Sequence, residues 1–251
     1  MNEPEIHSGV GNQQDKTRVQ SAQKILCDID GCLISGSRVL PGAREFVRRF
    51  ADKLVLVSNN STDTKVSLQA RLSSLDLSLH TDQFFLAGEE TLAWSVDHFG
   101  PGPMFLLANS QMQAAAAAIG LVHCANQPRA IIICRDTELT LGRLEAALLH
   151  IVKGCPVILA NDDITHPGEN GPAIESGALL HLLEKCHAPS QVIRIGKPMP
   201  RLLLRALGQV DADQAVMIGD NPKTDALAAR AAGIHPILVG ATTQRWLEHF
   251  L

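Results

Sequence analysis

The sequence has no tyrosine, and aromatic residues make up only 4% of its 251 positions. A surface that binds single-stranded nucleic acid by base stacking needs several aromatic side chains, so the composition argues against one. An excess of positive charge is also missing, because the formal net charge is −4. Without a basic field that neutralises phosphate backbones, nucleic acid is not an expected partner.

Long apolar segments are missing as well. The longest uncharged stretch, residues 98–128, is interrupted by prolines, glycines, glutamines and an asparagine, so it does not predict a membrane-spanning helix. Residues 1–21 are polar and lack the apolar region of a signal peptide. We expect these residues to form a flexible N-terminal tail outside the fold, and a membrane is not an expected partner.

The six cysteines form neither a CxxC pair nor a closely spaced group with histidine. This spacing argues against a disulfide scaffold and favours small apolar packing residues over zinc ligands or redox pairs. Unpaired cysteines are typical of a reducing compartment, so the predicted location is cytoplasmic.

The chain does contain enough apolar residues, 45%, to bury a core. Short apolar runs that end in polar residues alternate with amphipathic stretches of helical length. In the two outer parts of the chain we predict strands at 24–30, 53–57, 191–195, 215–218 and 236–239, and helices at 41–50, 63–75, 200–207 and 225–232. Continuous apolar strands indicate a parallel sheet covered by helices on both faces.

The middle of the chain repeats this pattern and predicts a second, smaller α/β domain. Strands are expected at 105–108, 130–134 and 157–160, and helices at 89–98, 111–119 and 141–152. Ligands of parallel α/β sheets bind at the carboxyl ends of the strands. Polar residues that follow the predicted strands are therefore the first candidates for chemistry.

Two carboxylates follow the first predicted strand, in the sequence Asp28-Ile29-Asp30-Gly31. Alternate residues of a strand point the same way, so Asp28 and Asp30 can converge on one site. Such a pair can hold Mg²⁺ while one carboxylate attacks as a nucleophile and the other moves protons. A solvated strand end is the alternative interpretation.

Three further polar features follow predicted strands. Ser58 and Asn59 come after the second strand, where they could bind a phosphate oxygen or cap the next helix. Lys197 offers a point charge for a phosphoryl group, and Asp220 and Asp225 flank a strand-to-helix turn. Carboxylates, hydroxyl, lysine and carboxylates again, in this order, are the groups that phosphoryl transfer through an aspartyl intermediate requires.

The segments DIDG, SN, GKP and GDNPKTD resemble the four ordered motifs of the haloacid dehalogenase (HAD) superfamily of phosphohydrolases. The long insert between the second and third segments resembles the type IIA cap of 4-nitrophenyl phosphatases, phosphoglycolate phosphatases and pyridoxal phosphate phosphatases. The resemblance implies a Rossmann-like parallel-sheet HAD core at 22–86 and 190–251, interrupted by a smaller inserted α/β cap domain at 87–189.

The resemblance also implies a role for each motif residue. Asp28 is expected as the nucleophile, and Asp30 as the general acid and base whose main-chain carbonyl also binds Mg²⁺. Asp220 is expected to complete the magnesium ligands Asp28 and Asp30, while Asp225 supports Lys197 or a metal-bound water. The expected phosphate contacts are Ser58, Asn59, Lys197 and Asn221.

Two cap residues are candidate contacts for the leaving group. Asp163 and His166 follow the predicted strand at 157–160, with an ordinary polar turn as the alternative. Asp162 stands where the family commonly has proline, and Asp136 is a weaker candidate of the same kind. Cys32, beside the nucleophile, suggests a hypothesis of oxidation sensitivity.

The sequence thus predicts an Mg²⁺-dependent phosphatase that acts on a small-molecule phosphate ester through an aspartyl phosphate. A phosphotransferase that uses an acceptor other than water is one alternative, and a non-catalytic interaction protein on the same scaffold is another. The resemblance is also compatible with a homodimer formed through the cap.

Overall fold

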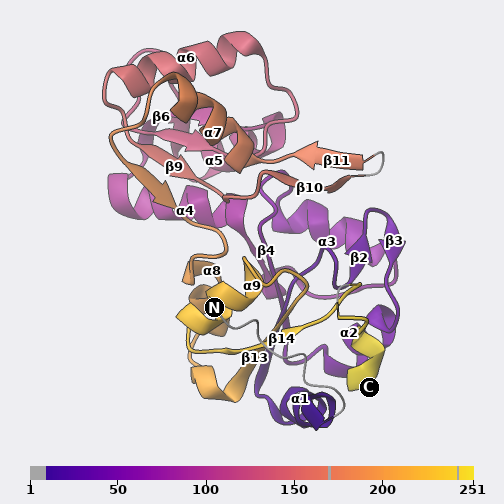
Figure 1. Ribbon diagram of the computed structural model, residues 1–251. Helices are drawn as coiled ribbons and strands as arrows, with labels where there is room; N and C mark the ends of the chain where they lie inside the picture. The colour runs from indigo at the N-terminus through magenta and orange to yellow at the C-terminus, as the bar shows by residue number, and fades with distance from the viewer. Residues whose placement is uncertain (1–9, 169–170, 242) are drawn as a thin grey trace, which may run out of the picture.

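The computed structural model describes residues 10–168, 171–241 and 243–251. Its helices and strands form two α/β units, one above the other in Figure 1, each built on a five-stranded sheet. All strand pairs in these two sheets are parallel. The predicted α/β class with a Rossmann-like parallel sheet is therefore confirmed.

The lower unit of Figure 1 contains the sheet β14-β13-β1-β4-β5. Its strands are β1 (Lys24–Cys27), β4 (Leu54–Ser58), β5 (Phe84–Leu86), β13 (Ala215–Gly219) and β14 (His235–Leu238). A small antiparallel pair, β2 (Ile34–Ser35) and β3 (Arg38–Val39), follows β1. The helices are α1 (Val10–Ser21), α2 (Ala43–Phe50), α3 (Lys65–Ser73), α8 (Arg201–Leu207) and α9 (Asp225–Ala231), with short 3-10 turns η1 (Thr81–Gln83), η2 (Ala212–Gln214) and η3 (Leu247–Phe250).

Both faces of this sheet are buried. Ile25 and Cys27 pack in one apolar cluster with side chains of α1, α2, α3 and η3. Leu26, which points the other way, packs in a second cluster with side chains of α8 and α9. Because β1 lies in the middle of the sheet and is covered on both sides, its carboxyl end has a fixed position in the molecule.

The upper unit has the sheet β12-β9-β8-β6-β7. Its strands are β6 (Gly102–Leu107), β7 (Leu121–His123), β8 (Ile131–Ile133), β9 (Val157–Leu159) and β12 (Val192–Arg194). Side chains of α4 (Ala87–Phe99) and α5 (Ser110–Ala118) pack on one face, and those of α6 (Leu141–Val152) and α7 (Ser176–Cys186) on the other. An antiparallel hairpin, β10 (Thr165–Gly168) and β11 (Gly171–Ile174), extends from this unit in Figure 1.

One strand belongs to a different sheet than predicted. The predicted division assigned residues 190–251 to the first unit, but β12 pairs with β9 in the second. The chain therefore returns to the first sheet only after Arg194. The hairpin and α7, both absent from the predicted elements, also lie in the second unit.

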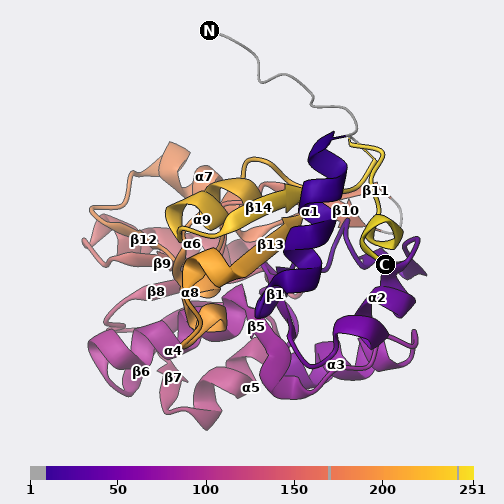
Figure 2. The same cartoon turned by 90° about the horizontal axis from the view of Figure 1, so that it is seen from below.

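The N-terminal segment differs from the predicted tail. Residues 1–9 lie outside the described residues, but residues 10–21 form α1, which lies beside η3 and the first sheet (Figure 2). Val19 is fully buried, while Asp15 pairs with Arg245 at 3.0 Å. Lys53 Nζ donates to the carbonyls of Val19, Gln20 and Ala22 at the end of the helix. The prediction of a flexible tail is therefore wrong for residues 10–21. It failed because this helix is polar and is held by tertiary contacts, so its sequence shows no apolar periodicity.

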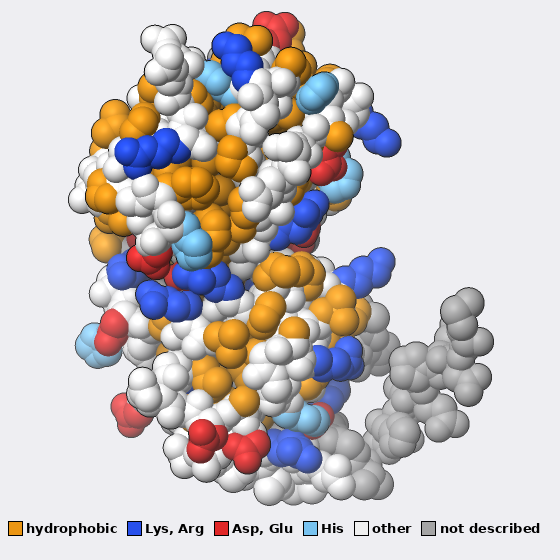
Figure 3. Space-filling view, turned by 90° about the vertical axis from the view of Figure 1, so that its left-hand side faces the viewer, with side chains coloured by type: hydrophobic (Ala, Val, Ile, Leu, Met, Phe, Trp, Pro, Cys, Tyr) orange, Lys and Arg blue, Asp and Glu red, His pale blue; other side chains and the backbone are white. Residues whose placement is uncertain are grey.

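Ion pairs join the two units on the side shown in Figure 3, where Lys and Arg side chains gather at their junction. Arg201 and Arg205 of α8 lie 2.7 Å and 3.4 Å from the carboxylate of Glu90 in α4. Within the described ranges, no helix is both long and apolar enough to cross a bilayer.

Candidate active site

The carboxyl ends of three adjacent strands meet at one edge of the first sheet. Asp28 directly follows β1, Ser58 ends β4 and Asp220 follows β13. The parallel order of these strands brings together polar groups that are far apart in the sequence.

A pocket of about 850 Å³ opens at this edge and extends to the second unit. Nine of the ten predicted site residues line it: Asp28, Asp30, Ser58, Asn59, Asp163, His166, Lys197, Asp220 and Asn221. The tenth, Asp225, is 1% exposed and contacts Lys197. The structure therefore brings all ten predicted residues to one place.

Lys197 connects the buried groups of this site. It is 1% exposed, and its Nζ lies 2.7 Å from Asp225 Oδ1 and 3.0 Å from Asp28 Oδ1. Nζ also donates to the main-chain oxygen of Val57 at 3.0 Å. A buried ammonium with three oxygen partners is fully satisfied, so it holds both carboxylates in fixed positions.

Asp225 is oriented by a second contact. Its Oδ2 accepts a hydrogen bond from Asn221 N at 3.0 Å, next to the Lys197 contact on Oδ1. Gly219 makes this arrangement possible, because a Cβ there would lie 2.3 Å from the Cβ of Asp225. The expected supporting role of Asp225 toward Lys197 agrees with this geometry.

The carboxylates of the site crowd one another. Burial raises the pKa of Asp28 well above its usual range, although the nearby Lys197 ammonium opposes this shift. Burial and, next, the Asp225 carboxylate raise the pKa of Asp220 to about 6. Burial alone would lower the pKa of Lys197, but Asp225 and Asp28 raise it above its usual range. The single ammonium thus stays charged and compensates only part of the negative charge.

This donor set fits a divalent cation. Carboxylate oxygens of Asp28, Asp220 and Asp225 all lie within 4.8 Å of one another. Gly31, with φ of 78°, provides space for Asp220, because a Cβ at position 31 would lie 2.1 Å from Asp220 Oδ2. Hard oxygen ligands of this kind match Mg²⁺, which would also relieve the repulsion between the carboxylates.

The members of this group differ in part from the predicted ligands. Asp225 takes part through its position, but both its oxygens already accept hydrogen bonds from the chain, which leaves Asp28 and Asp220 as the better direct ligands. The Asp30 side chain is outside the group, and the binding of metal by its main-chain carbonyl stays a prediction from the sequence.

Asp30 lies on the accessible side of the pocket. Partial burial by the pocket walls raises its pKa, whereas Arg71, His166 and Lys197 lower it by a smaller amount. A carboxyl group with a raised pKa, in contact with the pocket, is suited to give and take protons.

Asn59 is occupied by the protein itself. Its Nδ2 donates to Asp163 Oδ2 at 2.8 Å and to Lys197 O at 2.9 Å, while its Oδ1 accepts from Lys197 N at 2.8 Å. Both amide hydrogens are used, so in this arrangement the side chain has no donor for the phosphate contact expected from the sequence. Its contacts instead join the Ser58 loop, the Lys197 loop and the second unit.

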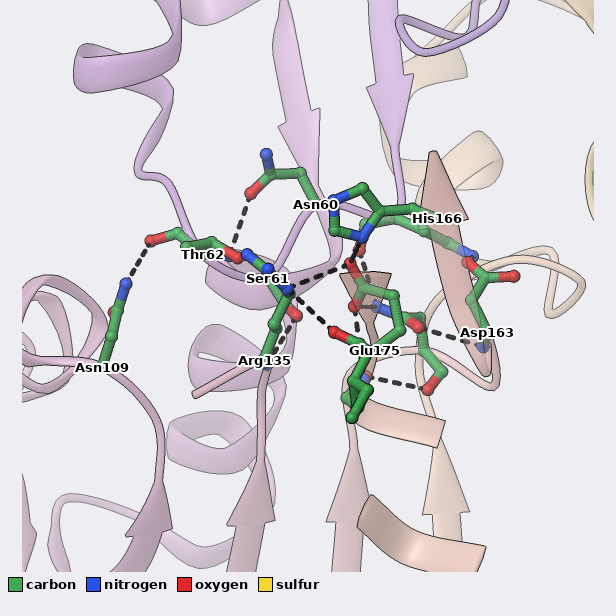
Figure 4. A network of polar contacts seen from close by, with 12 residues as sticks. Asn60, Ser61, Thr62, Asn109, Arg135, Asp163, His166 and Glu175 are labelled. Carbon is green, nitrogen blue, oxygen red and sulfur yellow. Dashed lines mark hydrogen bonds and ion pairs between the residues drawn. The ribbon is translucent and has the colours of Figure 1, made fainter. Parts of the chain in front are cut away.

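Three strands of the second unit hold the loop at 59–62 (Figure 4). The last residues of β6, β8 and β9 are paired in register. Two positions after each of these strands stands a residue that contacts the loop: Asn109 after β6, Arg135 after β8 and Asn161 after β9. They donate in turn to Thr62 O at 3.1 Å, Ser61 Oγ at 2.9 Å and Asn59 O at 2.8 Å. The second unit is thereby connected directly to the loop that follows β4.

The pocket wall of the second unit contains polar residues that the sequence did not single out. Glu175 Oε1 lies 2.8 Å from His166 Nδ1, without the alignment of a hydrogen bond, and 3.8 Å from Arg135 Nε. Glu175 Oε2 also accepts from Ser176 N at the start of α7. Glu175 directly precedes α7, a helix that was not predicted from the sequence. Its position before this helix is the only feature of the sequence that could have indicated it.

Two weaker candidates do not reach the pocket. Asp136 is buried, pairs with Arg143 and accepts from Glu138 N, so it stabilises the loop before α6. Cys32 is also buried, and this burial raises the pKa of its thiol well above the usual range, which disfavours the reactive thiolate. The hypothesis that Cys32 is oxidation-sensitive is therefore not supported.

All six cysteines lie in the described ranges and are unpaired. Cys27, Cys32 and Cys134 are buried as small apolar residues, and Cys124 and Cys155 are half-buried. Cys186 is exposed, so it is not the packing residue that was expected.

The protein is similar in sequence and structure to known phosphatases. A dihydroxyacetone phosphatase of Corynebacterium glutamicum is 26% identical over 219 residues, which cover 85% of this chain and 79% of that protein. The 5'-nucleotidase YutF of Bacillus subtilis is 28% identical over 220 residues, which cover 85% of each protein. The crystal structure of a 4-nitrophenylphosphatase from Thermotoga maritima has a TM-score of 0.82, with 27% identity and 90% of each chain covered.

The family comparison agrees with the strand-end motifs. The family model for haloacid dehalogenase-like hydrolases matches residues 23–233, a range that contains the whole site described above. The chain therefore belongs to the haloacid dehalogenase-like hydrolase family and is a phosphatase of that family.

Proposed function

We propose that this phosphatase hydrolyses a small phosphate monoester with Mg²⁺ and through an aspartyl phosphate formed on Asp28. The observation that supports this most is the position of Lys197, buried between Asp28 and Asp225 beside Asp220 on the wall of an open pocket. A carboxylate held by an ammonium next to a cation site is suited to attack a phosphoryl group.

The chain offers three oxygen ligands for the cation, and water and substrate oxygens would fill the other positions of Mg²⁺. Asp28, Asp220 and the main-chain carbonyl of Asp30 would hold it, which agrees with the crowding of carboxylates at this point. When bound there, Mg²⁺ supplies neutralisation of the negative charge on the phosphoryl oxygens.

The proposed reaction has two displacements. A carboxylate oxygen of Asp28 attacks phosphorus, the bond from phosphorus to the leaving oxygen breaks, and that oxygen takes a proton from Asp30. In the second displacement the Asp30 carboxylate takes a proton from water, whose oxygen attacks the same phosphorus. The bond from phosphorus to Asp28 then breaks, which releases phosphate and restores both carboxyl groups.

The second unit acts as the cap in this proposal. Asp163, His166 and Glu175 lie on its side of the pocket, where they face the space available to a leaving group. With β12 assigned to its sheet, the cap spans residues 87 to about 195 rather than 87–189. It excludes water from the first displacement and contacts the leaving group.

A screen of phosphate esters with and without Mg²⁺ tests the proposal. We expect release of inorganic phosphate that requires the metal and stops with EDTA. Turnover that continues in EDTA and is not stimulated by Mg²⁺ would contradict the proposal. Addition of alcohols or sugars tests the phosphotransferase alternative, because that activity would transfer phosphate to the added acceptor instead of releasing it.

The non-catalytic alternative is not supported, because every predicted catalytic residue is present and placed at the pocket or in contact with Lys197. A homodimer through the cap and a cytoplasmic location stay predictions from the sequence.

A further inference from the structure

The wall of the pocket that faces the leaving group has almost no aromatic surface. Among the lining residues that the structure describes, no phenylalanine or tryptophan occurs, and the only aromatic ring is the imidazole of His166. That ring is held beside Glu175, 2.8 Å from its carboxylate. A purine, pyrimidine or other flat ring would find no phenylalanine, tyrosine or tryptophan side chain to stack on here.

The charges of this wall are paired. Arg135 lies 3.8 Å from Glu175, and on the opposite side of the pocket Arg71 lies 3.4 Å from Asp63. The carboxylate of Asp163, which also lines the pocket, has no cation of its own in this set and accepts from Asn59. A second anionic group on the substrate would therefore meet cations that already have a partner, and carboxylates that repel it.

A hydroxyl group fits this wall better than an anion or an apolar ring. It can donate to the Glu175 or Asp163 carboxylate and accept from Arg135 or His166 at the same time. Glu175 is well placed for this contact, because it is mostly buried and is fixed by Ser176 N and by Asn161 Nδ2 at 3.4 Å. The wall thus presents donors and acceptors side by side with little net charge.

We propose that the leaving group of the natural substrate is an uncharged polyhydroxylated chain, that of a sugar or polyol phosphate, recognised by Glu175 together with Arg135 and His166. This inference rests on the proposed function and deepens it. It assigns Glu175 as a specificity-determining residue, because its negative charge offsets that of Arg135, which would otherwise attract a substrate carboxylate.

Matched substrate pairs test the inference. In the first pair, glycerol phosphate ends in a hydroxymethyl group where phosphoglycerate has a carboxylate. In the second pair, ribose phosphorylated on its primary hydroxyl lacks the base of adenosine monophosphate. Propyl phosphate lacks the hydroxyls of glycerol phosphate. In each pair we expect kcat/KM for the neutral hydroxylated ester to be higher by about tenfold or more.

A charge-removing variant tests the role of Glu175. Glu175→Gln keeps the size of the side chain and leaves Arg135 and His166 without their carboxylate, so the ratio of kcat/KM for phosphoglycerate over glycerol phosphate rises by about tenfold. Glu145→Gln, at an exposed position of α6, is the matched control and leaves the ratio unchanged. Arg135→Gln, which removes a cation, lowers the same ratio and provides an independent test if Glu175→Gln is poorly folded.

The outcomes separate this inference from the function on which it rests. The inference is overturned if the enzyme hydrolyses 4-nitrophenyl phosphate but has a kcat/KM for phosphoglycerate or adenosine monophosphate that equals or exceeds the value for the hydroxylated ester of the same pair. The phosphatase proposal would stand in that case. An unchanged ratio in well-folded Glu175→Gln overturns the role of Glu175. Absence of Mg²⁺-dependent turnover of every ester overturns both.

Discussion

The ammonium of Lys197 lies 3.0 Å from Asp28 Oδ1, at a point where both side chains are almost completely enclosed. The partner on the other side of Lys197 is Asp225, at 2.7 Å. The proposed nucleophile is therefore held in a fixed orientation by a cation that is itself fixed from behind the pocket.

Replacement of this cation should affect both catalysis and folding. Lys197→Met leaves two buried carboxylates without their partner, so we expect kcat/KM to fall by about a hundredfold to a thousandfold. We also expect the free energy of unfolding to fall by about 3–5 kcal/mol. Steady-state kinetics and urea unfolding measure the two effects. Lys153→Met, at an exposed site after α6, is the control, and equal effects of both variants would contradict the account.

The close approach of Gly31 to Asp220 predicts a metal-binding defect. In Gly31→Ala the new Cβ would lie 2.1 Å from Asp220 Oδ2, so this ligand must move. We expect the Mg²⁺ concentration for half-maximal activity to rise by about tenfold or more. Gly154→Ala has a similar φ, 85°, but no atom within 4 Å of the new Cβ, so it tests backbone strain alone. The same Mg²⁺ dependence in both variants would argue against a ligand role for Asp220.

The contact of Asn161 with the loop after β4 predicts coupling between the cap and the phosphoryl site. Asn161→Ala removes the hydrogen bond to Asn59 O and leaves this half-buried carbonyl without its donor, which costs about 1 kcal/mol of stability. Because Asn59 is bonded to the Lys197 main chain, we also expect a lower kcat. Asn126→Ala, in an exposed loop of the same unit, serves as the control. A loss of stability with unchanged kcat would limit Asn161 to a structural role.

The raised pKa values of Asp28 and Asp220 predict how stability depends on pH. Without metal, the folded protein keeps protons that the unfolded chain releases above the ordinary carboxyl pKa of 3.8. Since stability falls with pH wherever the folded state binds more protons, it should decline from that value through about 6, the pKa of Asp220. Bound Mg²⁺ favours the ionised carboxylates and should weaken or reverse this decline.

Thermal unfolding in EDTA and in excess Mg²⁺, measured over this pH range, checks the prediction. Asp220→Asn lacks one of the titrating groups, so its decline in EDTA should be smaller than that of the wild type. The raised pKa values would be contradicted if the unfolding temperature of the wild type in EDTA rose with pH through this range, and rose as much as that of Asp220→Asn.

The place where the candidate residues gather could be predicted from the sequence, because these residues follow apolar strands. Asp28 and Asp220 come directly after runs whose continuous apolar character indicates a sheet buried on both faces. Parallel order then places both carboxylates at one edge. The helix at 43–50 was equally readable, since its buried residues Ala43, Phe46, Val47 and Phe50 have helical spacing.

Other features depend on contacts that no local pattern encodes. β12 is a half-buried strand of three residues, and only its pairing with β9 reveals the sheet to which it belongs. Helix α1 is held by Asp15 and by Lys53 rather than by an apolar face. Glu175 and Arg135 meet only after the hairpin folds back toward the pocket, and Asn59 has three partners from distant parts of the chain. These residues could be found only from the tertiary structure.

The most direct test of the central claim is the rate at which Asp28→Asn hydrolyses 4-nitrophenyl phosphate in saturating Mg²⁺. The amide keeps the size of the side chain but is a far weaker nucleophile, so the account predicts a folded protein whose turnover is lower by about ten-thousandfold or more. A folded Asp28→Asn variant that hydrolyses the ester at the wild-type rate would contradict it.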